Sequence, residues 1–82
     1  MNFTKEIKSL KQIIESLQTK QDNLENKIKN REDVFEEKSE KWQESQKGLD
    51  FQEVTEMLDD QCSELAGIIS DMEMHLGTLN DF

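Results

Sequence analysis

The sequence contains no proline and no tyrosine, and its 82 residues include one cysteine and three isolated glycines. Because no proline interrupts the chain and strand-forming residues are scarce, we expect an all-α fold. The single cysteine, Cys62, excludes an intrachain disulfide framework and any zinc module that needs several cysteines. A lone cysteine fits a reducing compartment, so we expect a cytoplasmic protein.

Long hydrophobic runs are also missing. No stretch approaches the roughly 18 apolar residues of a membrane span, and no signal-peptide pattern is present at the start. Hydrophobic residues make up 33% of the chain and charged residues 35%. So short and polar a chain buries little surface by itself, and we expect oligomerisation into a bundle to complete the fold.

What is present is a seven-residue hydrophobic repeat in the first half of the chain. It predicts one long helix over residues 3–47, which must pack against another helix. Gln21 interrupts the repeat, either as a buried amide that fixes the register or where water enters between the helices. Arg31 replaces a leucine of the repeat, so a break near residues 30–33 is left open. The repeat consists of Phe3, Ile7, Leu10, Ile14, Leu17, Gln21, Leu24, Ile28, Phe35 and Trp42.

Gly48 predicts a turn over residues 48–50, since glycine suits the left-handed position that ends a helix. Asp50 and Glu53 resemble a capping box, and Leu49 and Val54 occupy the positions of a hydrophobic staple. These signals predict a second helix over residues 51–78, with its own seven-residue repeat.

So short a turn predicts a two-helix antiparallel coiled-coil hairpin. Trp42 is expected to pack inside it, with an exposed anchor for a partner as the alternative. The predicted hairpin core contains Leu24, Ile28, Phe35, Trp42, Phe51, Val54, Leu58, Cys62, Leu65, Ile69 and Met72.

A turn at residues 48–50 also places Leu65 level with Asp33, which leaves residues 1–17 as an overhang without a partner in the chain. This segment has a dense apolar stripe, so we expect the chain to self-associate through it. A homodimer is expected, with a tetramer as the alternative. The predicted oligomer interface consists of Phe3, Ile7, Leu10, Ile13, Ile14 and Leu17.

Charge is divided along the chain. Residues 1–31 carry a net charge of +3 and residues 32–82 a net charge of −12. The acidic end of the hairpin either docks on a basic protein surface, or imitates nucleic acid, or is simply a solvated face. Direct binding of nucleic acid is not expected, because the basic residues are few and dispersed. The predicted acidic tip consists of Glu36, Glu37, Glu40, Glu44, Glu53, Glu56, Asp59 and Asp60.

Residues that could carry chemistry are few. Cys62 and His75 lie on the same predicted helix at a separation of about 20 Å, which is too far for a shared metal ion or a nucleophile pair. The acidic run near Asp59 lacks the spacing of a calcium loop. We therefore expect no catalytic residue, no cofactor, no metal site and no enzyme activity.

The expected architecture resembles the small helical hairpins of bacterial secretion systems, including WXG-type proteins and type III needle subunits. WXG proteins place tryptophan and glycine one residue apart in the turn, whereas five residues separate Trp42 from Gly48 here. The proline-bearing turn of needle subunits is missing, so no family is assigned.

The expected function is a non-enzymatic coiled-coil module for protein interaction or assembly. The alternative is an acidic inhibitor that blocks a basic nucleic-acid-binding protein.

Overall fold

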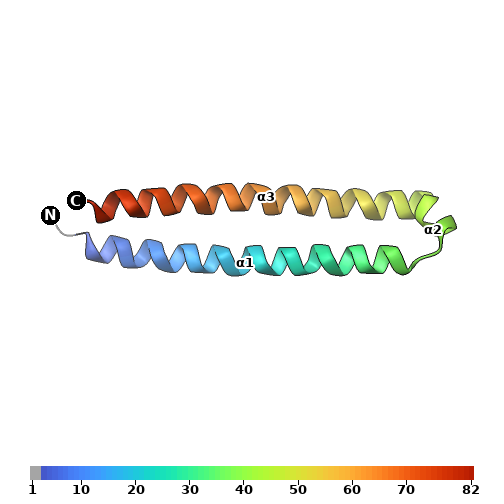
Figure 1. Cartoon of the computed structure of the whole chain (residues 1–82), viewed down its shortest axis with the longest axis horizontal. Coiled ribbons are helices and arrows are strands. Elements are labelled where there is room, and N and C mark those ends of the chain that lie inside the picture. The colour runs from blue at the N-terminus through green and yellow to red at the C-terminus, as the bar shows by residue number, and fades with distance from the viewer. Residues whose placement is uncertain (1–2) are drawn as a thin grey trace.

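The computed structural model describes residues 3–82, which form an antiparallel pair of long helices (Figure 1). Helix α1 spans Thr4–Glu37 and helix α3 spans Gln46–Asn80, with the short helix α2, Glu40–Glu44, in the connection between them. The rod measures 64 × 14 × 12 Å. The predicted all-α helical hairpin is confirmed.

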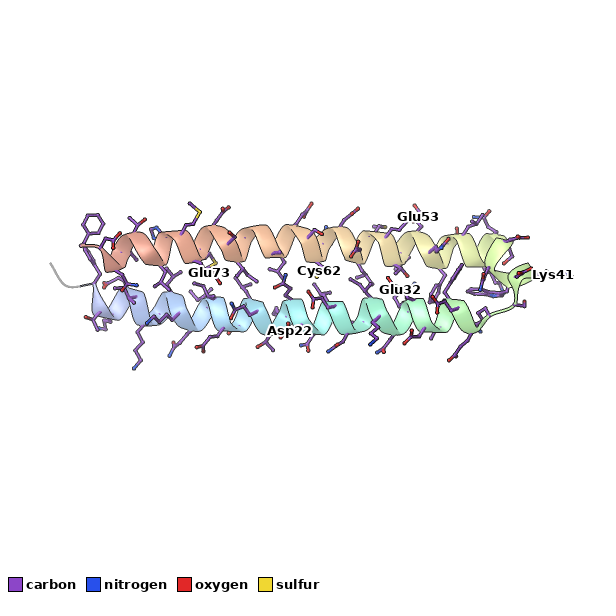
Figure 2. All side chains as sticks on the ribbon, viewed as in Figure 1. Asp22, Glu32, Lys41, Glu53, Cys62 and Glu73 are labelled. Atoms are coloured by element: carbon purple, nitrogen blue, oxygen red, sulfur yellow. The ribbon has the colours of Figure 1, made fainter. Side chains whose placement is uncertain are left out.

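Side chains from both helices meet in one seam along the rod (Figure 2). The least exposed are Ile14, Ile28, Cys62 and Ile69, at 6–8% of their full accessible surface. In α3 the seam continues through Gly48, Phe51, Thr55, Leu58, Leu65, Met72, Leu76 and Leu79, all buried or half-buried. These positions alternate in steps of three and four residues, as a coiled-coil seam requires.

One predicted core residue is outside this seam. Val54 keeps 45% of its surface exposed, so its assignment to the hairpin core is wrong. Its neighbour Thr55 takes the seam position instead and is buried. The sequence signals place Val54 in a hydrophobic staple at a helix start near Asp50, whereas α3 begins at Gln46.

The predicted turn at residues 48–50 is wrong, and so are the helix limits of 3–47 and 51–78. Two serines set the actual limits. Lys38 is extended after α1, and the Ser39 side chain accepts a hydrogen bond from the Trp42 amide at the start of α2. The Ser45 side chain accepts one from the Gly48 amide at the start of α3. Both serines are N-caps, which satisfy amides that have no partner within the helix.

Gly48 is a buried residue of α3 rather than a helix-ending glycine, and its φ is not positive. A β-carbon at this position would overlap the carbonyl oxygens of Trp42 and Gln43. Glycine is therefore needed here for the close approach of the α2 backbone. The expected capping box is also replaced, because Asp50 accepts a hydrogen bond from the Gln46 side chain at 2.7 Å.

The predicted overhang is wrong as well. Because the chain turns at residues 38–45, α1 and α3 have nearly equal lengths and run side by side to their far ends. The Phe3 ring lies 5.9 Å from the Phe82 ring, and Gln18 donates a hydrogen bond to Glu73 at 3.2 Å. Residues 3–17 therefore have α3 as a partner, while residues 1–2 lie outside the described part of the chain.

The register of the two long helices agrees with this turn. Arg31 is level with Thr55, to which it donates a hydrogen bond, and Phe35 is level with Phe51. The expected pairing of Leu65 with Asp33 is therefore wrong, because Leu65 lies beside the Lys20–Lys27 part of α1. Helix α1 continues through residues 30–33, so no break occurs there.

Candidate interaction surface

Four β-branched aliphatic side chains remain exposed on one side of the rod. Four residues keep 43–51% of their surface exposed, although each directly precedes a seam residue in the sequence: Ile13, Val34, Val54 and Ile68. All four occupy the same heptad position, the g position when the seam is lettered a and d. We call this side the aliphatic flank and define it by Ile13, Lys20, Lys27 and Val34 of α1 and Val54, Gln61, Ile68 and His75 of α3.

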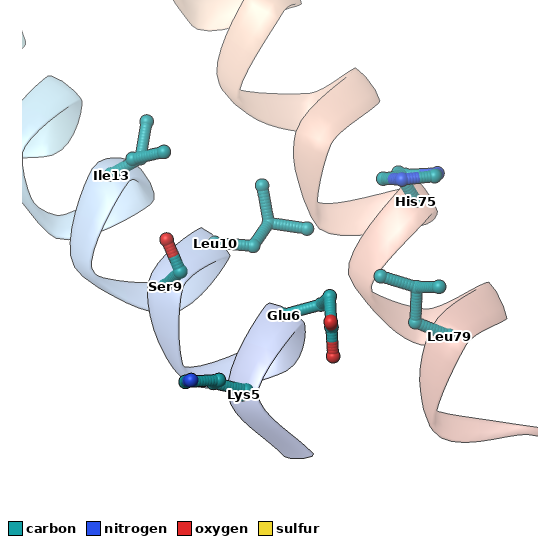
Figure 3. A pocket seen from close by; sticks show the side chains of 7 residues that line it. All are labelled: Lys5, Glu6, Ser9, Leu10, Ile13, His75 and Leu79. Carbon is teal, nitrogen blue, oxygen red and sulfur yellow. The ribbon is translucent and has the colours of Figure 1, made fainter. Parts of the chain in front are cut away.

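The two helices contribute to this flank from the same side. Ile13 of α1 and His75 of α3 line one hollow, with Leu10 reaching from α1 toward α3 (Figure 3). Steps of seven residues toward the turn then place Lys20 beside Ile68, Lys27 beside Gln61 and Val34 beside Val54. The four exposed β-branched residues therefore lie on one flank of the hairpin, whereas Leu49 and Met74 are exposed away from it.

The flank is hollowed beside the part of α1 that extends from Lys5 to Lys27. The hollow at Ile13 and His75 has a volume of about 430 Å³. A second hollow, of about 260 Å³, lies between Ile13 and Lys20, and a third, of about 300 Å³, lies between Lys20 and Lys27 and reaches Leu65 of α3. Such shallow, partly apolar depressions suit the side chains of another helix, which pack as ridges into grooves.

Charge divides this flank between the helices. On α1, Lys20 and Lys27 lie between Ile13 and Val34. The adjoining outer positions are serines and asparagines up to Asn30, followed by Glu37 near the turn. On α3 the adjoining outer positions include Glu64 and Asp71. The α1 half of the flank is therefore basic and the α3 half acidic, so each half complements the other half rather than itself.

The opposite flank has a different character. Its heptad positions hold mainly acidic and amide side chains: Gln18, Glu25, Glu32, Gln52, Asp59 and Glu73.

Burial raises the pKa of the Cys62 thiol in the adjoining seam, and the negative charges of Glu25 and Asp59 raise it further. The Cys62 thiol lies 4.0 Å from the backbone carbonyl oxygen of Gln21, and Gln21 itself is half-buried in the seam.

The end of the rod near α2 is closed by aromatic rings. Trp42 packs edge-on against Phe35 and Phe51, with ring centroids 6.0 and 5.8 Å apart, and Phe35 stacks on Phe51. The Arg31 guanidinium lies 3.9 Å from the centre of the Phe51 ring. Trp42 therefore packs inside the hairpin, as the sequence predicts, against one ring from each long helix.

The predicted oligomer interface of residues 1–17 is mostly taken up by the hairpin itself. Ile14 is buried and Phe3, Ile7, Leu10 and Leu17 are half-buried in the seam with α3. Ile13 alone of this group is exposed, and it belongs to the aliphatic flank. The sequence carries the signal for this distinction, because Ile13 is out of phase with the seam by one residue from Ile14.

The eight residues of the predicted acidic tip are all exposed, and they lie in the half of the rod nearest α2. Docking of this tip on a basic surface, or imitation of nucleic acid by it, stays a prediction. Within residues 3–82, no group of three or more histidine, cysteine, aspartate or glutamate side chains is arranged to hold a metal ion.

Comparison with protein-family models, with curated proteins and with solved structures finds no match to this chain. Among residues 3–82, no helix has the length and apolar character needed to cross a membrane.

Proposed function

We propose that this chain is a non-enzymatic protein-interaction and assembly module of the cytoplasm, and that its contact surface is the aliphatic flank. The observation that carries the proposal is the concentration of Ile13, Val34, Val54 and Ile68 at one heptad position. In a two-stranded coiled coil this position normally holds charged residues, because it borders solvent. A stripe with a third apolar position is typical of helices that face a larger bundle.

The same residues are of little use to the hairpin alone. A β-branched residue has a lower helix propensity than glutamine or lysine, and each of the four leaves about half of its surface in water. The seam is already complete without them. Their placement is explained if another helical surface covers them.

The proposal keeps a role for the N-terminal helix in association, but through another set of residues. Helix α1 contributes Ile13, Lys20, Lys27 and Val34, whereas the residues of its seam face α3. The contact surface then extends over both helices and about half of the length of the rod, instead of being confined to residues 1–17.

The test separates folding from interaction. Ile13→Gln, Val34→Gln, Val54→Gln and Ile68→Gln combined in one chain should leave the helical circular dichroism unchanged and the free energy of unfolding, extrapolated to infinite dilution, within about 1 kcal/mol of the wild-type value. A matched variant, Ile14→Gln with Ile69→Gln in the seam, should unfold the hairpin. Loss of folded structure in the flank variant would show that the four aliphatics serve the fold, and would overturn the proposal.

A further inference from the structure

The occupant of the aliphatic flank can be inferred from charge and size. We propose that it is a second copy of this chain, arranged so that α1 of each copy lies over α3 of the other and the two α2 ends lie at the same end of a four-helix bundle. This inference rests on the proposed function, because it identifies the partner of that surface.

The face of the rod that carries the flank is large enough for such a pair only if it is used beyond the flank itself. The whole face measures 64 × 14 Å, about 900 Å². The flank residues extend over about 32 Å of its length, whereas a standard stable interface buries about 800 Å² from each partner, so the pair must also bury the face on either side of the flank. A self-complementary flank is also what a two-fold dimer needs, since the same patch must serve both copies.

Charge selects between the two ways of stacking the flanks. If the two-fold axis runs across the rod, α1 lies on the partner's α1. Lys20, near the middle of α1, then faces its own copy, and Glu64, near the middle of α3, does the same. Like charges oppose each other in both helix pairs, which disfavours this arrangement.

If the axis runs along the rod, α1 lies on the partner's α3 at the level that the hairpin register sets. Lys20 then lies between the levels of the partner's Glu64 and Asp71, and Lys27 lies within a helical turn of Glu64. Ile13 and Val34 meet the partner's α3 near His75 and Val54. Every neighbouring pair of helices is antiparallel in this bundle, which is the usual arrangement for short-looped helices.

Near the turn, two acidic residues oppose this arrangement, because Glu37 of α1 and Asp50 of α3 hold the heptad position of Glu64 and Asp71 and lie at similar levels. The other acidic residues of this region do not. Glu53, Glu56 and Asp60 occupy heptad positions on the outer side of α3, and Asp59 lies toward the opposite flank. The surfaces brought together are therefore the basic half of α1 and the Glu64–Asp71 stretch of α3.

Charge reversal tests the pairing. The variants Lys20→Glu/Lys27→Glu and Glu64→Lys/Asp71→Lys should each be folded but associate at least tenfold more weakly than the wild type in sedimentation equilibrium. An equimolar mixture of the two should restore association as a heterodimer. The control Lys8→Glu/Lys29→Glu reverses two lysines away from the flank and should associate like the wild type. Failure of the mixture to associate would overturn the arrangement.

A distance measurement tests the orientation independently. With Cys62→Ser and a spin label at Lys41→Cys on α2, the two labels of a dimer should lie much closer together than the rod length of 64 Å. Labels separated by about the rod length would show that the two α2 helices lie at opposite ends of the dimer, and would overturn the arrangement. A wild-type chain that stays monomeric at every concentration would overturn the second copy as partner, yet would leave the flank variant's folding test unaffected, so the two proposals fail separately.

Discussion

Arg31 Nε donates a hydrogen bond to the Thr55 hydroxyl at 2.9 Å, and this contact fixes the register between α1 and α3. The same guanidinium donates through Nη2 to the Phe51 carbonyl at 3.0 Å and stacks over the Phe51 ring. An arginine at a seam position gains less from burial than a leucine would, but its planar donors fit one alignment of the two helices. A polar group in an apolar seam selects a register in this way.

The first prediction follows from this pair. Thr55→Val should lower the free energy of unfolding by about 1 kcal/mol, because one guanidinium donor loses its partner in a half-buried site. Arg31→Leu with Thr55→Val should be at least as stable as the wild type, since an apolar pair replaces the polar one. Urea denaturation of Arg31→Leu, Thr55→Val and the double variant gives the coupling energy between the two residues. Strict additivity would show that the two residues do not act together.

The second prediction concerns two glycines of α3. Gly67 is exposed with no atom near the position of a β-carbon, so Gly67→Ala should raise the free energy of unfolding by about 0.5–1 kcal/mol. Gly48→Ala should instead lower it by about 1–3 kcal/mol, because the new methyl group overlaps the backbone of α2. Thermal or urea unfolding measures both variants. Equal effects of the two alanines would contradict the structure of the turn.

The third prediction concerns the thiol of Cys62. Its pKa lies above the ordinary value of 9.0 in the folded chain, chiefly through burial and also through Glu25 and Asp59. The thiolate is the reactive form, so iodoacetamide at pH 8 should modify Cys62 more slowly in the folded protein than in guanidinium chloride. A cysteine introduced at Lys41 on α2 should react quickly in the folded state. Similar rates for Cys62 in both states would contradict its burial.

The sign of the pH effect follows from the same shift. A thiol with a raised pKa in the folded state contributes its stability fully below the unfolded pKa, and this contribution is lost as the pH rises above 9 toward the folded value. The stability difference between the wild type and Cys62→Ala should therefore shrink above pH 9. A difference that does not change with pH would show that the thiol is not perturbed.

The hydrophobic repeat was sufficient to predict the helices, their antiparallel pairing and most of the seam, because seven-residue spacing determines which face of a helix is apolar. It did not locate the turn. Gly48 fits the pattern of a helix-ending glycine, whereas α1 ends at Glu37 and Ser39 and Ser45 cap the starts of α2 and α3. Serine is a common residue, so its capping role depends on where the flanking helices meet, and that depends on the pairing of distant residues such as Arg31 and Thr55.

The candidate surface depended on the same error. With the turn placed at residues 48–50, residues 1–17 had no partner and Val54 belonged to the core. Moving the turn toward Ser39 brings α3 beside residues 3–17 and leaves Val54 and Ile68 with Ile13 and Val34 on one flank. The heptad position of each residue is legible in the sequence, but the exposed side of the hairpin is defined only once the partner helix is known.

Methyl NMR over a range of protein concentrations tests the proposed self-association through the aliphatic flank most directly. The methyl signals of Ile13 and Ile68 should shift as the mass rises from 9.6 kDa to twice that value, while those of Leu49 and Met74, exposed away from the flank, should stay in place. Constant signals for Ile13 and Ile68, or shifts confined to Leu49 and Met74, would contradict the account.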